Sequence, residues 1–219
     1  MVRLSVARED YLRAISKLEE GAQPVTVSAL AGQMGVTPPS VTGMLQRLVA
    51  DGLVAHTPRA GIRLTDQGEA LALSVHRRHR LLETFLVQVL GLDWSEVHEE
   101  AEALEHHLSD RVVEAIDHYL GHPRVDPHGH PIPAADGAVI ARNLRPLDSL
   151  AAGEEAVISE VLSDDPERIR WWKAQGLVPG ARITVIARRP LDGVWRLRVG
   201  PDEVVVGEQG VGGLRVEKL

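Results

Sequence analysis

A proline-rich stretch divides this sequence into two parts that must fold differently. Residues 121–134 include four prolines. A helix cannot continue through them, because proline lacks the amide proton and clashes with the preceding helical turn. Before this stretch apolar residues recur at helical spacing, whereas from about residue 155 short β-type runs alternate with Gly, Pro and Asp. The sequence therefore predicts an α+β chain that is helical first and ends in a small β-barrel.

Six helices are expected before the prolines. They cover about 6–18, 26–34, 37–51, 66–90, 95–109 and 110–120, and two short strands at 53–56 and 62–65 precede the fourth helix. Gly35 separates the second helix from the third, where Thr37 is a favourable N-cap and Pro38 suits the first turn. Two short helices followed by a hairpin, with its turn at 57–61, predict a winged helix-turn-helix.

We accordingly divide the chain into four regions. Residues 1–65 are the winged helix-turn-helix, 66–122 a helical domain, 123–150 a proline-rich linker and 151–219 the barrel, with one short helix at about 166–175. The chain contains no cysteine, which excludes disulfides and Cys-type zinc fingers. It also lacks an apolar run of the roughly 18 residues that a membrane span needs. We therefore expect a cytoplasmic protein with no membrane partner.

The charge distribution favours DNA binding by the first part of the chain. The first 80 residues contain ten Lys and Arg and seven Asp and Glu, a net charge of +3, whereas the rest contains 14 and 24, a net charge of −10. Small, hydroxylated or amide side chains at the start of the third helix could approach base edges, and arginines could contact phosphates. The candidate DNA-contacting residues are Thr37, Pro38, Pro39, Ser40, Thr42, Gln46, Arg47, Arg59 and Arg63.

Histidines and carboxylates recur on the later helices at spacings that suit a metal ion. His79 and Glu83 are four residues apart and share a helix face. On the next helix His98, Glu102, Glu105 and His106 fall within one broad stripe. Two such stripes on neighbouring helices can converge on one or two cations. The other histidines, including His128 and His130 in the proline-rich turn, are interpreted as surface or turn residues.

No catalytic motif accompanies these residues. A zinc protease needs His-Glu-x-x-His, and here His98-Glu99 is not followed by a histidine at the required position. A nucleophile elbow and a Gly-rich phosphate loop are also missing from the sequence. We therefore expect a protein that is not an enzyme and takes no small-molecule substrate.

Three segments resemble the diphtheria-toxin-repressor family of iron- and manganese-dependent transcription regulators. They are Glu9-Asp10-Tyr11-Leu12, His79-Arg80-Leu81-Leu82-Glu83 and the stretch 97–106; the turn at 127–133 is also similar. The resemblance implies that the C-terminal barrel is an SH3-like domain related to the FeoA module. It implies a primary metal site of Asp10, Glu102, Glu105 and His106. It also implies an ancillary site of His79, Glu83 and His98, to which Asp165 or Glu167 of the barrel could add a ligand.

Two departures from the family pattern bear on the metal. Iron-type members place soft Met and Cys ligands where this chain has Asp10 and Glu102, and hard oxygen ligands favour Mn²⁺, with Fe²⁺ as the alternative. Manganese-type members often have a further helix-1 carboxylate where this chain has Arg13, which cannot ligate a metal. We therefore expect separate primary and ancillary sites instead of a compact two-manganese cluster.

The resemblance implies a metal-dependent repressor that binds a palindromic double-stranded DNA operator as a homodimer and controls metal homeostasis genes. Two alternatives stay open from the residues alone: a metal-independent winged-helix regulator, and a metal-handling accessory protein. The candidate apolar interface, which could equally be intramolecular core, comprises Leu82, Phe85, Leu86, Val89, Leu90, Val112 and Ile116.

Overall fold

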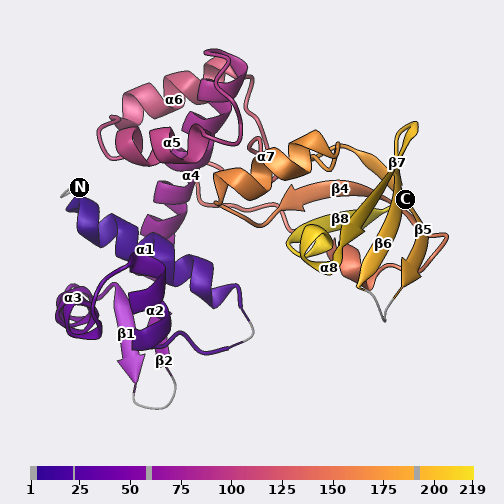
Figure 1. The fold of residues 1–219 in the computed structure, drawn as a ribbon. Helices are drawn as coiled ribbons and strands as arrows, with labels where there is room; N and C mark the ends of the chain where they lie inside the picture. Colours follow the sequence, from indigo (N-terminus) through magenta and orange to yellow (C-terminus); the bar gives the residue numbers. More distant parts are fainter. Residues whose placement is uncertain (1–3, 22, 58–60, 190–192) are drawn as a thin grey trace. The chain divides into compact units, whose positions relative to one another are not determined.

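The chain forms two compact units, drawn as a ribbon in Figure 1. The computed structural model describes residues 4–21, 23–57, 61–189 and 193–219. The first unit comprises Met1–His79 with Pro133–Ala138, and the second comprises Arg80–Ile132 with Val139–Leu219. Among the described residues, no helix is both long and apolar enough to cross a membrane.

The first unit contains the predicted winged helix-turn-helix. Its elements are α1 (Val6–Glu19), α2 (Val27–Met34), α3 (Pro38–Ala50), β1 (Val54–Thr57), β2 (Gly61–Leu64) and the first part of α4 (Asp66–Gln88). Thr26 caps α2 by accepting a hydrogen bond from the amide of Ala29 at 3.1 Å. Gly35 ends α2 with φ of 63°, a left-handed conformation that glycine adopts without strain. This turn sets α3 at an angle to α2.

The β-hairpin packs against the three helices through a common apolar core. β1 and β2 pair antiparallel, and Ile62 of β2 also donates its amide to the carbonyl of Val25 at 2.9 Å. Leu12, Ile15, Leu30, Leu45 and Leu48 fill the core with almost no exposure. Val49, near the end of α3, lies outside this core and is 44% exposed. The middle of the predicted hairpin turn, residues 58–60 with the candidate Arg59, lies outside the described residues.

The second unit begins with the rest of α4, followed by α5 (Val97–Glu105) and α6 (Asp110–Tyr119). The helix α5 is shorter than predicted at both ends. At its start, Asp93 accepts hydrogen bonds from the amide and hydroxyl of Ser95 at 2.9 and 2.7 Å, which forms a turn in place of helix. After it, Ser109 caps α6 and so separates the two helices.

The C-terminal part of the second unit is a six-stranded antiparallel sheet that curves into a small barrel (Figure 1). Its elements are β3 (Arg145–Pro146), a 3-10 turn η1 (Leu147–Ser149), β4 (Glu155–Val161), α7 (Pro166–Ala174), β5 (Arg182–Arg189), β6 (Val194–Val199), β7 (Asp202–Gly207), α8 (Glu208–Val211) and β8 (Leu214–Lys218). The strand order is β3-β8-β4-β5-β6-β7. Register shifts in β4 and β5 mark bulges, which increase curvature. Trp172 and Trp195 are fully buried in its core.

The proline-rich stretch is irregular, as predicted, and its central turn is bound to the barrel. His128 accepts a backbone hydrogen bond from Val161 of β4 at 2.9 Å. The guanidinium of Arg142 donates to the carbonyl of Gly129 at 2.6 Å. Gly129 has φ of 89°, and a Cβ there would collide with the carbonyl oxygen of Ser159. The turn therefore depends on glycine both for its conformation and for its close approach to β4.

We predict that Gly129→Ala lowers the free energy of unfolding by about 2–4 kcal/mol, because it adds overpacking to left-handed strain. Gly153→Ala is the matched control, since Gly153 has φ of 88° and open space around its Cβ position. It should lose only about 1–2 kcal/mol from strain alone. Urea denaturation measures both. Equal losses in the two variants would show that the contact with Ser159 contributes nothing.

Candidate metal centre and DNA-contacting helix

A buried carboxylate on α4 is shared by two histidines from distant parts of the second unit. Glu83 is 2% exposed. One of its oxygens lies 3.2 Å from Nδ1 of His98 on α5, and the other lies 3.7 Å from Nδ1 of His128 in the proline-rich turn. Because an uncompensated buried carboxylate is costly, the two histidines are needed to stabilise the buried charge of Glu83. The same three side chains are potential metal ligands.

The position of His128 is set by a backbone carbonyl. Its Nε2 lies 2.9 Å from the carbonyl oxygen of Trp94, and since that oxygen can only accept, Nε2 carries the proton. Nδ1 is then directed at Glu83. Burial lowers the pKa of His128, but hydrogen bonding and charge attraction from Glu83, with the charge of Asp126, outweigh it and raise the pKa overall. A backbone carbonyl that accepts the proton of one imidazole nitrogen is typical of metal-binding histidines, in which the other nitrogen binds the metal.

A second group of donors adjoins His128. One ligand atom from each of Asp126, His128 and His130 lies within 4.8 Å of the others. Asp126 accepts the backbone amides of His128 and His130 at 2.8 and 2.9 Å, and its other oxygen lies 3.2 Å from Nδ1 of His130. Sequence reasoning missed Asp126, His128 and His130 as donors. The available signal was the recurrence of a possible ligand at every second residue, at 126, 128 and 130.

His79 lies on α4, one turn before Glu83, and is buried. In the first unit its Nδ1 lies 3.1 Å from Nη1 of Arg13 on α1. Of the predicted ancillary residues, Glu83 and His98 are in contact. Helical spacing places His79 on the same face of α4 as Glu83.

The predicted primary residues belong to both units. Asp10 lies on α1, in the first unit. In the second unit Glu105 is fully buried, and its Oε1 lies 3.2 Å from Nε2 of His106. Glu102 is half-exposed and lies 3.6 Å from Nε2 of His98, a member of the predicted ancillary set. The shared role of these four residues stays a prediction.

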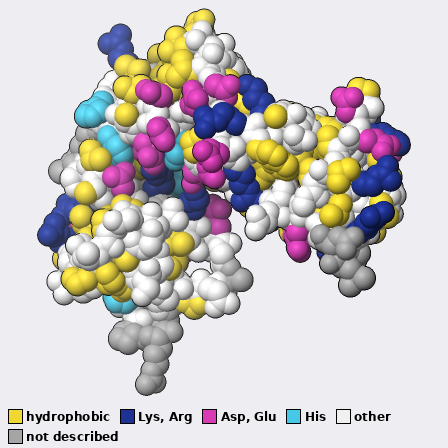
Figure 2. Space-filling view, viewed as in Figure 1, with side chains coloured by type: hydrophobic (Ala, Val, Ile, Leu, Met, Phe, Trp, Pro, Cys, Tyr) yellow, Lys and Arg dark blue, Asp and Glu magenta, His cyan; other side chains and the backbone are white. Residues whose placement is uncertain are grey.

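Acidic side chains gather over the helical part of the second unit, with histidines among them (Figure 2). The exposed acids of α5 are Glu99, Glu100 and Glu102. In the barrel Asp165 caps α7 by accepting the amide of Glu167 at 3.0 Å. The guanidinium of Arg168 lies 4.6 Å from the centre of the Trp172 ring and donates to the carbonyl of Gln209. These contacts give Asp165 and Arg168 structural roles; metal ligation by Asp165 or Glu167 stays a prediction.

One face of α3 is buried and the other is exposed, as a DNA recognition helix requires. Val41, Leu45 and Leu48 are buried, whereas the candidate DNA-contacting residues on α3 and the wing that the structure describes are all exposed: Thr37, Pro38, Pro39, Ser40, Thr42, Gln46, Arg47 and Arg63. Thr37 occupies the predicted N-cap position of α3, but its side chain makes no capping hydrogen bond. Its hydroxyl instead lies 3.0 Å from that of Ser40, at the exposed helix start.

Comparison with known proteins identifies the family. Residues 3–62 match the model of the iron-dependent repressor N-terminal DNA-binding domain, and residues 65–134 match its metal-binding and dimerisation domain. Residues 145–218 match the FeoA domain. The chain is 34% identical to the iron-dependent repressor IdeR of Mycobacterium tuberculosis strain H37Rv, with 96% of each chain covered. It belongs to the iron-dependent repressor family.

A further relative and two solved structures are also similar to this chain. The diphtheria toxin repressor of Corynebacterium efficiens is 31% identical over 81% of this chain and 82% of its own. A solved manganese-dependent transcriptional repressor in complex with manganese has a TM-score of 0.90 at 38% identity, covering 97% of this chain and all of its own. ScaR with bound Zn²⁺ has a TM-score of 0.82 at 33% identity, covering 97% and 99%.

The predicted resemblance and fold class are therefore confirmed. The chain is a member of a family of metal-dependent transcriptional repressors, with a DNA-binding domain, a helical metal-binding and dimerisation domain and a C-terminal FeoA domain.

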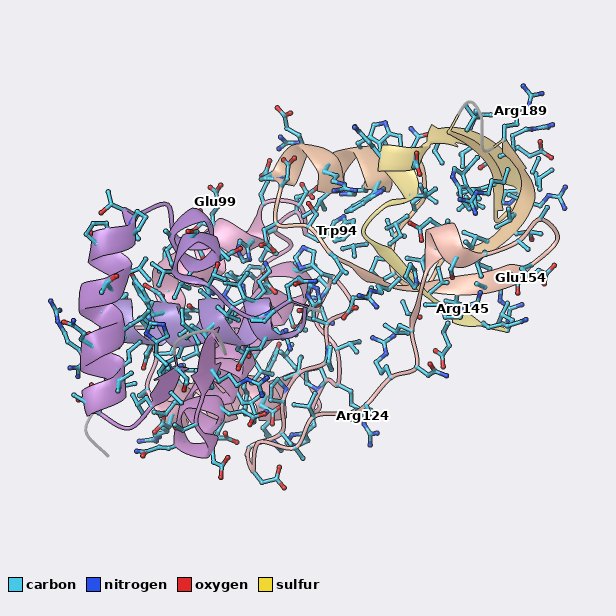
Figure 3. The ribbon with its side chains drawn as sticks, turned by 90° about the horizontal axis from the view of Figure 1, so that it is seen from below. Trp94, Glu99, Arg124, Arg145, Glu154 and Arg189 are labelled. Atoms are coloured by element: carbon cyan, nitrogen blue, oxygen red, sulfur yellow. The ribbon has the colours of Figure 1, made fainter. Side chains whose placement is uncertain are left out.

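In this family member, charged pairs hold the segment between α4 and α5 to α7 of the barrel. Trp94 of that segment, labelled in Figure 3, packs against the barrel core. Beside it Lys173 lies 2.6 Å from Asp93, and Arg170 lies 3.1 Å from Glu96. The hydrogen bond from Lys173, followed by those from the amide and hydroxyl of Ser95, lowers the pKa of Asp93 to about 2. This segment also supplies the carbonyl that orients His128.

We predict that Asp93→Asn removes an acid-sensitive part of the stability. A carboxyl whose pKa is depressed on folding contributes stability above its unfolded pKa, about 3.9, and loses it as the pH falls toward 2. The contribution should stay below about 1 kcal/mol, since Asp93 and Lys173 are half-exposed. Thermal unfolding between pH 2 and 5 measures it. Lys173→Met should cost little further in the Asp93→Asn background, and a wild-type pH slope in Asp93→Asn would contradict the assignment.

Proposed function

We propose that this chain is a metal-activated repressor, without enzymatic activity, that binds a palindromic DNA operator as a homodimer when loaded with Mn²⁺, or alternatively Fe²⁺, and controls metal homeostasis genes. The observation that carries the proposal is the buried Glu83 with its two imidazoles, a carboxylate–histidine set on helices that follow a winged helix-turn-helix. Membership of the iron-dependent repressor family supports it.

Two sets of ligands are proposed. The primary set is Asp10, Glu102, Glu105 and His106, and the ancillary set is His79, Glu83 and His98. The arrangement in the second unit adds His128 as a further ancillary donor, because its Nδ1 is already directed at Glu83. Carboxylates and imidazoles without thiolates suit Mn²⁺ and Fe²⁺. A bound cation would replace the ion pairs of these residues and neutralise their charge.

Activation requires that the metal bind the DNA-competent arrangement more tightly than the alternatives. Asp10 belongs to the unit that carries α3, whereas Glu105 and His106 belong to the second unit. A cation that takes ligands from both would favour one arrangement of the reading helix relative to the dimerisation domain. Metal binding and operator binding would then be reciprocally coupled.

An open apolar groove on the helical part of the second unit is the proposed dimer interface. It has a volume of about 340 Å³ and is lined by Phe85, Arg111, Val112, Ala115, Ile116 and Tyr119. Tyr119 is 70% exposed, which is unusual for a large ring next to other apolar side chains. Leu82 and Leu86, two of the predicted interface residues, instead pack inside the unit against Val97 and Ala101.

In the first test, we expect the protein to bind a palindromic operator fragment in the presence of Mn²⁺ and to lose that binding when a chelator is added. Asp10→Ala and Glu105→Ala should lose the metal-dependent part, at least tenfold in apparent affinity, since each removes a charged ligand. His118→Ala is the control, because His118 belongs to neither proposed set. Gel shifts at a fixed salt concentration measure all four proteins. Undiminished sequence-specific binding in chelator would favour the metal-independent regulator.

The second test concerns the dimer. Val112→Glu should shift the protein toward monomer by about a hundredfold or more in dissociation constant, because it places an unpaired charge in the groove. Ile140→Glu is the matched control, since Ile140 is 46% exposed, against 43% for Val112, and does not line the groove. Analytical ultracentrifugation distinguishes the two. A dimer that survives Val112→Glu unchanged places the interface elsewhere.

A further inference from the structure

An arginine of α1 is hydrogen-bonded to a ring nitrogen of one proposed metal ligand. Nη1 of Arg13 lies 3.1 Å from Nδ1 of His79. A guanidinium carries only donors and stays charged at any ordinary pH, so Nδ1 of His79 must be the acceptor. The contact therefore fixes the state of the imidazole: Nδ1 has a lone pair that receives a hydrogen bond, and Nε2 carries the proton.

A metal ion needs the same lone pair. Imidazole binds metal through a deprotonated nitrogen, and in this state Nδ1 is the only one that His79 offers. If the ring instead moved its proton to Nδ1 to present Nε2, the Nδ1 proton would face the guanidinium proton and the hydrogen bond would be lost. Whichever nitrogen binds, the Arg13–His79 bond and a His79–metal bond exclude each other.

We infer that Arg13 is an internal competitor of the metal at His79. It is a positioning residue that sets the cation concentration at which the His79 and Glu83 end of the ancillary site fills. The inference rests on the proposed function, because it takes His79 as a ligand. Arg13 is partly exposed, so its guanidinium can leave His79 for solvent when a cation binds.

Charge acts in the same direction as the hydrogen bond. A divalent cation at His79 would lie within a few ångströms of a permanent positive charge, and repulsion at that distance persists even with strong solvent screening. The guanidinium therefore disfavours the bound cation twice, by occupying the lone pair and by repelling the ion. An amide at position 13 would keep a donor and remove the charge, which separates the two effects.

The experiment is calorimetric titration of the full chain with Mn²⁺, using the wild type, Arg13→Met, Arg13→Gln and Arg8→Met. Arg13→Met removes both donor and charge, and should tighten Mn²⁺ binding about tenfold or more at the sites that need His79. Arg13→Gln should give a smaller gain. Arg8→Met is the control, because Arg8 is also on α1 and pairs with Asp51 on the surface. The gain should disappear in Arg13→Met with His79→Ala.

A second readout needs no metal. Long-range ¹⁵N NMR of the histidines should show the Nε2–H tautomer of His79 in the wild type, and Arg13→Met should change the Nδ1 signal. Unchanged Mn²⁺ affinity in Arg13→Met and Arg13→Gln, with wild-type unfolding temperatures, would overturn the inference while leaving the proposed function intact. A wild type that binds no Mn²⁺ or Fe²⁺ would overturn both.

Discussion

The second unit depends on how the buried charge of Glu83 is compensated. Removing a carboxylate from water is costly unless other groups replace its solvation. Here the replacements come from α5 through His98 and from the proline-rich turn through His128. The proline-rich turn is itself bound to β4, because the carbonyl of His128 accepts a hydrogen bond from the amide of Val161. One carboxylate therefore links α4, α5, the turn and the barrel, and explains why a stretch with four prolines takes a defined conformation.

The contacts that stabilise this arrangement without a metal are the ones a metal would use. The carbonyl of Trp94 holds the proton on Nε2 of His128 and directs Nδ1 at Glu83, so the ligand is oriented in advance. Preorganisation alone raises the affinity and would let the site fill at low cation concentrations, which is unsuitable for a sensor. Competing partners correct this, because Arg13 on His79 and the imidazole pairs on Glu83 must be displaced first.

The sequence predicted what helical periodicity determines. The i,i+4 spacing of His79 and Glu83 places both on one face wherever α4 packs, and Gly35 and Pro38 define the helix-turn-helix locally. It could not predict His128, because the direction of that side chain depends on contacts of the turn with Trp94 and β4. Nor could it separate Leu86, inside the unit, from Phe85 in the groove, since both continue one apolar stripe. Nor could the sequence place the strands β3 and β8, because their pairing is decided by partners distant in the sequence.

The net charge of −7 also restricts how a cation could activate DNA binding. Even two divalent ions per subunit would leave the chain negative, and at physiological ionic strength charges are screened beyond about 8 Å. Loss of long-range repulsion between the acidic α5 and DNA is therefore too weak to switch operator binding. The cation must act through short-range geometry, by requiring particular ligands to meet. That requirement explains why most of the proposed ligands lie on helices, whose backbones hold each side chain in place. It also explains why a single arginine on α1 can influence when they meet.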